Sequence, residues 1–308
     1  MSMRTVIGRG LIAASLLTGA ALGVAAPAQA ADTDLAISAT RLVLEPGERG
    51  YTGTYHVTVT NTGDEPAGAS VRIVEPVAGS FRGLRPSEAC LYDGPVSGRR
   101  VIGCGLPGGE LAPGEVRKFR IDFGVLTTPR DVAMSAADTT TQLVRSGADT
   151  VLATATSRTL FRSTTGVLTR PQPYVQDVQT DLSVTSPGEV TLTRQGDGSF
   201  LGTLPVTVRW GGDAPHDELA LETLVPEGFE FAGAGNDTMC MFPWCYLAGG
   251  PFAPGQTSTL DLQITAPAGT PTGTTGTGTA TAVASWRYTE QTDIDPADNT
   301  ASFRIVVG

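Results

Sequence analysis

The stretch from Cys104 to Phe123 reads CGLPGGELAPGEVRKFRIDF, and the stretch from Cys245 to Ile264 reads CYLAGGPFAPGQTSTLDLQI. Placed one above the other without a gap, they share Cys, Leu, Gly-Gly and Ala-Pro-Gly, seven identities in twenty positions. Identities that keep one register are typical of an internal repeat. The sequence therefore predicts one module written twice.

A second aligned pair lies upstream of the first. Gly53 to Pro66 (GTYHVTVTNTGDEP) matches Gly202 to Pro215 (GTLPVTVRWGGDAP), again without a gap. Apolar and polar residues alternate in both, the period of two expected of a β-strand with one buried face. The predicted inner faces are Tyr55, Val57 and Val59 with Leu204, Val206 and Val208, and after the Ala-Pro-Gly turn Phe119, Ile121 and Phe123 with Leu260, Leu262 and Ile264.

The fold class follows from these short strands and the turns between them. The 38 glycines and 21 prolines suit a chain with many turns, and we find no apolar period of 3.6 residues that would indicate a helix. Units of about 130 to 140 residues with this pattern favour β-sandwiches with Greek-key connections over a barrel or a propeller. We predict an all-β chain with two tandem sandwich domains, residues 31–162 and 180–308, joined by a semi-extended linker over residues 163–179.

The first thirty residues have the organisation of a secretory signal peptide. Arg4 and Arg9 precede an apolar stretch from Leu11 to Ala26, and small residues follow at Ala28-Gln29-Ala30. The apolar stretch is shorter and more interrupted than the roughly 20 apolar residues of a membrane-spanning helix. We expect cleavage after Ala30, no transmembrane anchor, and a secreted protein that is extracellular or loosely associated with the cell wall.

The charge of the chain argues against nucleic acid as a partner. The sequence has 21 basic and 31 acidic residues, a formal net charge of −10. Nucleic-acid binding needs a basic face that neutralises phosphates. The expected partner is instead a cell-envelope component or another protein.

Four cysteines occupy corresponding places in the two copies, Cys90 with Cys104 and Cys240 with Cys245. An even count grouped in this way predicts two intradomain disulfides in an oxidising compartment. By restricting the unfolded chain, the first disulfide should stabilise the fold by about 3 kcal/mol and the second by about 2 kcal/mol. Within the first pair we expect a hairpin that turns at Asp93-Gly94-Pro95. A zinc site made of all four cysteines is the alternative, but its ligands would come from two domains and lack the two-residue spacing of a zinc knuckle.

The second copy resembles a known bacterial family. The residues that carry the resemblance are VPEGFEF at Val225 to Phe231, the cysteine pair, the Leu-x-Gly-Gly-x-x-Ala-Pro-Gly run, and the ending DIDPADNTA at Asp293 to Ala301. They look like the conserved-repeat domain called domain of unknown function 11, which is related to adhesion modules of bacterial surface proteins. The first copy matches through Phe123 and lacks the Asp-Pro-x-Asp-Asn ending. The resemblance implies an immunoglobulin-like fold in tandem copies on exported proteins, and no catalytic residues.

Residues for catalysis are scarce. His56 and His216 are the only histidines, the first predicted on the polar face of a strand and the second in a solvated turn. No Gly-x-Ser-x-Gly elbow and no free cysteine is available as a nucleophile. Lys118 is the only lysine, and its place on a polar face argues against an internal isopeptide crosslink. We therefore predict that the protein is not an enzyme, and a hydrolase is the weakest of the hypotheses kept.

Two clusters are candidate binding sites. The first consists of Phe242, Trp244 and Tyr246, which lie in or beside the small Cys240 to Cys245 loop. A rigid aromatic edge there would bind a ligand with little loss of entropy. The alternative is that Trp244 only covers the end of the sandwich. The second cluster is a candidate calcium site, although its spacing misses the EF-hand pattern and Asp-Pro-x-Asp is also a common turn. Its oxygen-bearing residues are Asp293, Asp295, Asp298 and Asn299.

These observations lead to two hypotheses about function. The first is a secreted, non-enzymatic structural or adhesive module of the cell envelope, in which rigid tandem sandwiches present binding loops. The alternative is a carbohydrate- or cell-wall-binding protein that uses the aromatic loop at Cys240 to Cys245. Apart from the candidate calcium, neither hypothesis requires a cofactor.

Overall fold

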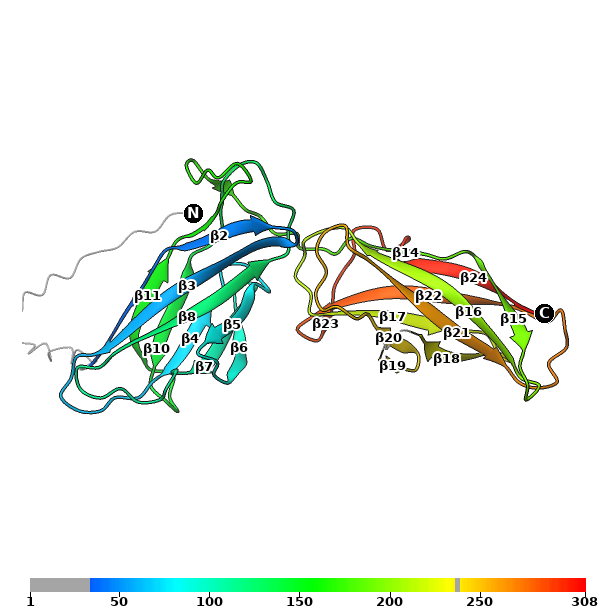
Figure 1. The fold of residues 1–308 in the computed structure, drawn as a ribbon, viewed down its shortest axis with the longest axis horizontal. Helices are drawn as coiled ribbons and strands as arrows, with labels where there is room; N and C mark the ends of the chain where they lie inside the picture. The colour runs from blue at the N-terminus through cyan, green and yellow to red at the C-terminus, as the bar shows by residue number, and fades with distance from the viewer. Residues whose placement is uncertain (1–33, 236–238) are drawn as a thin grey trace, which may run out of the picture. The chain divides into compact units, whose positions relative to one another are not determined.

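A computed structural model of the chain describes residues 34–235 and 239–308 (Figure 1). These residues form strands, turns and loops and contain no helix, so the predicted all-β class is confirmed. The signal peptide predicted for residues 1–30 lies outside the described residues. Within the described ranges, no helix is long and apolar enough to cross a membrane.

Strand β3 (Gly50–Asn61) organises the first sheet of the N-terminal half, the name used here for residues 34–162. On one side it pairs along its length with β8 (Val116–Val125), which also pairs with β5 (Phe81–Arg85). On its other side, β1 (Leu35–Ala39) pairs with one end of β3 and β2 (Leu42–Gly47) with the other. The predicted inner face of β3 is buried, because Tyr55, Val57 and Val59 are each 0% exposed.

The remaining strands of this sheet come from later in the sequence. Strand β12 (Thr159–Phe161) runs parallel to β2, and β9 (Met134–Ser135) pairs with β12. Strand β13 (Gln172–Pro173), which falls inside the predicted linker, pairs with β9. The sheet therefore has eight strands.

A second sheet of the same half has five strands. Strand β4 lies between β10 and β7, and the two edges are β11 and β6. The bounds are β4 Ser70–Val74, β6 Cys90–Val96, β7 Arg99–Gly105, β10 Thr139–Val144 and β11 Val151–Ser157.

The hairpin predicted between Cys90 and Cys104 is present, but its turn was placed wrongly. Strand β6 ends at Val96 and β7 begins at Arg99, so the turn residues are Ser97 and Gly98, both with positive φ. Asp93 and Gly94 lie inside β6, where the register shifts at a bulge between Tyr92 and Pro95. Two residues at positive φ match the twist of the flanking strands, which is why this pair forms the turn.

The C-terminal half, residues 180–308, repeats the pairing pattern around its own long strand. Strand β16 (Phe200–Trp210) pairs with β21 (Thr257–Ala266), and β21 also pairs with β18 (Glu230–Ala234). Strands β14 (Leu182–Thr185) and β15 (Glu189–Arg194) pair with opposite ends of β16, as β1 and β2 pair with β3. Even the bulges correspond, at Phe81/Gly83 in β5 and Phe231/Gly233 in β18.

The other strands of this half continue the same sheet, so that it has eleven strands. Strand β22 pairs with β17 on one side and with β24 and β23 on the other, and β17 leads through β20 to the edge strand β19. The bounds are β17 Glu218–Leu224, β19 Cys240–Met241, β20 Trp244–Tyr246, β22 Thr275–Trp286, β23 Thr289–Glu290 and β24 Thr300–Val307.

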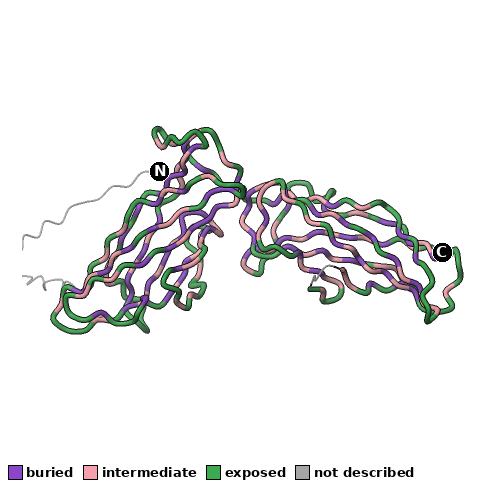
Figure 2. Tube along the Cα trace, viewed as in Figure 1, coloured by how far each residue is buried: buried purple, intermediate pink, exposed green. Residues whose placement is uncertain are grey.

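Each half has a hydrophobic cluster of its own. One cluster includes Tyr55, Ile121 and Phe123, and the other includes Leu204 and Leu262. Figure 2 shows buried and exposed positions alternating along the long strands, as expected where one face of a sheet is buried. This alternation leaves the opposite face of each sheet free to carry polar or aromatic side chains.

The segment predicted as a linker is partly built into the fold. Tyr174 is 9% exposed and belongs to the N-terminal cluster, with its ring 4.9 Å from that of Phe161. Its hydroxyl donates a hydrogen bond of 2.9 Å to Asp213, whose carboxylate also accepts the Asp177 N–H at 2.8 Å. Burial raises the pKa of Asp213. These contacts tie Tyr174 and Asp177, both inside the predicted linker, to Asp213.

Candidate functional site

Both disulfides close hairpins at directly paired positions. The structure joins Cys90 to Cys104 between β6 and β7, and Cys240 to Cys245 between β19 and β20, each with a Cα–Cα distance of 4.1 Å. No cysteine is left free, so the zinc alternative has no thiolate ligands. Two disulfides fit an oxidising, extracellular environment.

The second disulfide fixes a pair of aromatic side chains on one face of β20. Cys245 is fully buried, and Trp244 and Tyr246 on either side of it are half-buried. Since successive side chains of a strand point to opposite faces, both rings lie on the face away from the core. The predicted pair Trp244 and Tyr246 is therefore brought together.

A hollow of about 170 Å³ lies against these rings. The neighbouring strand β17 contributes Ala220, which is paired with Tyr246, and Glu218, while β22 contributes Val283 and Ser285. The small side chain of Ala220 leaves the space that a larger residue would fill. We call this hollow, lined by Glu218, Ala220, Trp244, Tyr246, Val283 and Ser285, the aromatic groove.

Phe242, the third predicted contact, does not line the aromatic groove. It occupies the turn of the hairpin and is 73% exposed. Met241, which the sequence analysis did not single out, is paired with Trp244 across the hairpin and is also exposed. Directly paired residues share a face of a sheet, so Met241 extends the apolar surface next to the Trp244 ring.

Charge at the aromatic groove is negative. The Glu218 carboxylate accepts a hydrogen bond of 3.3 Å from the Ser285 hydroxyl. Glu222, two residues along β17, is paired with Trp244 and so lies on the same face. Among the described residues, neither glutamate forms an ion pair with an arginine or lysine.

The acidic cluster proposed for calcium serves a structural role. Asp293 is buried, and its carboxylate accepts hydrogen bonds from the Thr180 hydroxyl, the Leu182 N–H and the Asp295 N–H at 2.8 to 2.9 Å. The side chain of Asp295 in turn accepts from the Ala297 N–H. Within the described part of the chain, no group of three or more His, Cys, Asp or Glu residues is placed to hold a metal ion. The turn explains the spacing of Asp293, Asp295, Asp298 and Asn299, and we do not propose calcium binding.

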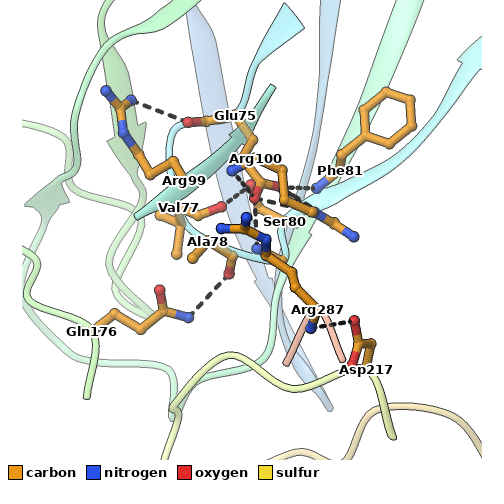
Figure 3. Close-up of polar contacts among 11 residues, drawn as sticks. Glu75, Val77, Ala78, Ser80, Phe81, Arg99, Arg100, Gln176, Asp217 and Arg287 are labelled. Atoms are coloured by element: carbon orange, nitrogen blue, oxygen red, sulfur yellow. Dashed lines mark hydrogen bonds and ion pairs between the residues drawn. The ribbon is translucent and has the colours of Figure 1, made fainter. Parts of the chain in front are cut away.

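A buried ion pair that the sequence analysis missed lies in the N-terminal half (Figure 3). Glu75 is 0% exposed, and its carboxylate lies 3.2 Å from the Arg100 guanidinium. The same carboxylate accepts the backbone N–H groups of Gly79, Phe81 and Arg100. Because these donors saturate its oxygens and order the loop between β4 and β5, we assign Glu75 a structural role rather than that of a catalytic base.

The two histidines differ from one another. His56 is exposed, as its place on a polar strand face predicts. The expectation that His216 lies in a solvated turn was wrong, because it is 6% exposed and its ring centroid is 3.9 Å from that of Trp210. Its Nε2 accepts the Phe252 N–H at 2.7 Å, which leaves Nδ1 to donate to the Ala214 carbonyl. Burial lowers the pKa of His216, so the ring is a neutral part of the core.

Comparisons with known proteins give no family. No family model matches the chain, and no curated protein matches it. Solved structures that match include a protein of unknown function from Porphyromonas gingivalis, with 11% identity over 89% of this chain and 99% of that one at a TM-score of 0.24. The CfaE adhesin of enterotoxigenic E. coli matches with 11% identity over 89% of this chain and 85% of that one at a TM-score of 0.26.

Proposed function

We propose that the protein is an exported, non-enzymatic adhesive module of the cell envelope that binds its target through the aromatic groove. The observation that carries the proposal is the pair of Trp244 and Tyr246 on the outer face of β20, over a hollow with a glutamate at its side. Half-exposed aromatic rings around a hollow provide a large contact area where a partner can bind.

The frame around the aromatic groove is rigid. The Cys240 to Cys245 disulfide ties β19 to β20, and β20 is paired with β17 over three residues. Side chains held in place before binding lose little conformational entropy when a partner docks. A preformed groove on a disulfide-closed edge therefore suits an adhesive function.

The two halves support the view of a repeated module. In each half one long strand, β3 or β16, pairs with two short N-terminal strands on one side and with one long strand on the other. We interpret the halves as two immunoglobulin-like sandwiches of one origin. Repetition of a rigid unit extends the reach of the binding face from the envelope.

The non-enzymatic part of the proposal rests on what the buried polar groups do. The carboxylates of Glu75 and Asp293 and both ring nitrogens of His216 have hydrogen-bond partners within the fold. A general base needs a free lone pair directed at a substrate. These groups act as structural polar contacts.

A polysaccharide is the second candidate target. Two rings on one strand face, next to the Glu218 carboxylate, resemble the stacking and hydrogen-bonding groups that a sugar would need. The same surface thus supports the carbohydrate-binding alternative. The choice between the two candidates depends on the ligand rather than on the location of the site.

The test is co-sedimentation of the oxidised protein, exported and processed by its host, with isolated cell envelopes and with insoluble polysaccharides. We expect pelleting with envelopes, and about a tenfold loss of affinity in Trp244→Ala with unchanged melting. Tyr288→Ala is the matched control, since Tyr288 is 98% exposed in the same half and does not line the groove. A wild-type protein that pellets with neither material would overturn the proposal.

A further inference from the structure

We infer that the aromatic groove binds a cationic side chain, an arginine or lysine presented by a protein partner. This inference rests on the proposed function and names the ligand class of its site. It follows from three features taken together: aromatic faces, carboxylates without ion-pair partners, and the net charge of the C-terminal part of the chain.

The rings supply the first feature. Trp244 and Tyr246 line the hollow together with the small side chain of Ala220 and with Val283. A cation that lies over the face of a Trp or Tyr ring is attracted by the ring quadrupole, and Trp is the strongest of the aromatic partners. A hollow of about 170 Å³ accepts a side-chain head group, not a folded element.

The carboxylates supply the second feature. Glu218 lines the hollow, and Glu222 is paired with Trp244 on the same face of the sheet. Among the described residues neither has an arginine or lysine within ion-pair distance, whereas Glu189 in the same half is paired with Arg304 at 3.4 Å. Two uncompensated carboxylates beside aromatic rings are complementary to a guanidinium or ammonium group.

Net charge supplies the third feature. Residues 163–308 contain 5 arginines, no lysine and 16 acidic residues, whereas residues 34–162 contain 14 basic and 14 acidic residues. A surface with an excess of one sign raises the local concentration and association rate of oppositely charged partners. The excess of acidic over basic residues thus lies in the part of the sequence that carries the groove.

A cation explains these features better than a neutral sugar does. A sugar ring gains from stacking on Trp244 but nothing from the net charge, and it would leave Glu222 without a counter-charge. An anionic polymer would be repelled by the same carboxylates. We therefore infer that the ligand is a basic polypeptide segment. The apolar stem of its arginine or lysine side chain also packs along the exposed Met241.

The experiment is a titration of the oxidised protein, labelled with ¹⁵N at its tryptophan indoles, with three peptides of equal length: alternating Arg-Gly, Lys-Gly and Gln-Gly. The chain has three tryptophans, at 210, 244 and 286, so each indole signal can be assigned by substitution. We expect the Arg-Gly and Lys-Gly peptides to shift the Trp244 signal, with an affinity that falls as salt is added, and the Gln-Gly peptide to leave it unchanged.

Matched variants separate a specific site from general charge attraction. Glu218→Gln with Glu222→Gln should weaken binding of the Arg-Gly peptide about tenfold or more. The control, Glu227→Gln with Glu230→Gln, removes the same charge from two exposed residues outside the groove and should change affinity less than about twofold. Equal losses in the two double variants, or a Trp244 signal that responds to a neutral oligosaccharide and not to Arg-Gly, would overturn the inference.

This outcome is distinguishable from failure of the proposed function. Envelope pelleting that survives Glu218→Gln with Glu222→Gln, and that is insensitive to salt, would retain the adhesive function and remove the cationic ligand. Arg-Gly binding at Trp244 without envelope pelleting would retain the groove and its ligand class and remove the envelope target.

Discussion

The two halves of the protein pair their inner strands in the same way and differ at their last strand. In the C-terminal half, β24 is continuous and pairs with β22 on one side and with β15 on the other. In the N-terminal half the corresponding segment is divided at Arg158: β11 pairs with β10, and β12 pairs with β2. The C-terminal half therefore has one sheet of eleven strands, and the N-terminal half has sheets of eight and five.

The division has a local cause in polar side chains. Next to Arg158, the hydroxyl of Ser157 accepts the Leu42 N–H, and buried Thr159 shares a hydrogen bond of 3.0 Å with Thr139. The corresponding part of β24 alternates the buried apolar residues Phe303, Ile305 and Val307 without interruption. The inner strands therefore keep the same pairing in both halves, whereas the last strand tolerates a break.

The largest effect is expected from matched core substitutions. Ile121 and Leu262 occupy corresponding positions of β8 and β21 and are each 0% exposed. Ile121→Ala and Leu262→Ala should each lower the free energy of unfolding by about 2 to 5 kcal/mol, through lost burial and the cavity left behind. Urea unfolding followed by tryptophan fluorescence reports on the C-terminal half, since all three tryptophans lie there, whereas circular dichroism reports on both halves.

With separate cores, Leu262→Ala should shift the fluorescence transition and Ile121→Ala should leave it in place while shifting the dichroism transition. An equal shift of the fluorescence transition by both would show that the two halves unfold as one unit and are not independent.

A proline in the last strand should destabilise the C-terminal half more than the N-terminal half. The Arg304 N–H donates to the Gly188 carbonyl at 2.8 Å, so Arg304→Pro removes a ladder hydrogen bond and should cost about 2 to 3 kcal/mol. Among the described residues, no backbone hydrogen bond is made by the Arg158 N–H. Arg158→Pro should therefore cost less than about 1 kcal/mol, because no bond is lost. Thermal unfolding of both variants measures the difference, and equal losses would contradict the assignment of a break at Arg158.

The pH dependence of stability should differ between the halves because of His216. Burial holds its folded pKa below the value of about 6.5 for an unfolded histidine. The contribution of His216 to stability is fully present above pH 6.5. It is lost as the pH falls from there through the pKa of His216 in the folded state, because the unfolded state binds the proton first. The fluorescence-detected urea midpoint should therefore fall between pH 7.5 and pH 5.

His216→Gln should reduce that fall, and His56→Gln, at an exposed histidine, serves as the control and should keep it. A midpoint that falls equally in all three proteins would assign the pH dependence to carboxylates instead.

The smallest effect is expected from a pair of matched surface ion pairs. Arg162 lies 2.8 Å from Glu45 where β12 meets β2, and Arg304 lies 3.4 Å from Glu189 where β24 meets β15. Exposed pairs of this kind contribute little, so Glu45→Gln and Glu189→Gln should each change stability by about 0.5 kcal/mol or less. Denaturation at low and high salt measures the effect, and a loss above about 1 kcal/mol would show that one pair stabilises its parallel strand contact more than exposure suggests.

Much of the fold could be predicted from local patterns in the sequence. Alternation predicted the buried faces of β3, β8, β16 and β21, and the even, grouped cysteines predicted the same pairs that the structure joins. The departure of the first copy after Phe123 falls where the two halves differ in structure. The hairpin turn at Ser97–Gly98 was missed because Asp93-Gly94-Pro95 carries the stronger turn residues, which the strand accommodates as a bulge.

The candidate site was predicted only in part, because it is assembled from distant segments. Trp244 and Tyr246 are visible in the sequence next to a cysteine, whereas Glu218 and Ala220 come from β17 and Val283 from β22. Nothing in their local sequence marks these three as neighbours of the rings. Likewise, burial of Glu75 and His216 depends on loops that fold back over them, which a lone Glu or His does not reveal.

Strand character and cysteine pairing could be predicted from the sequence, since they depend on the period of two and on spacing along the chain. Only the tertiary structure decided which strands are neighbours, where the last strand breaks, and which side chains share the aromatic groove. The physical reason is that strand pairing and register are set by contacts between residues far apart in the chain. A groove made from β17, β20 and β22 exists only once those contacts have formed.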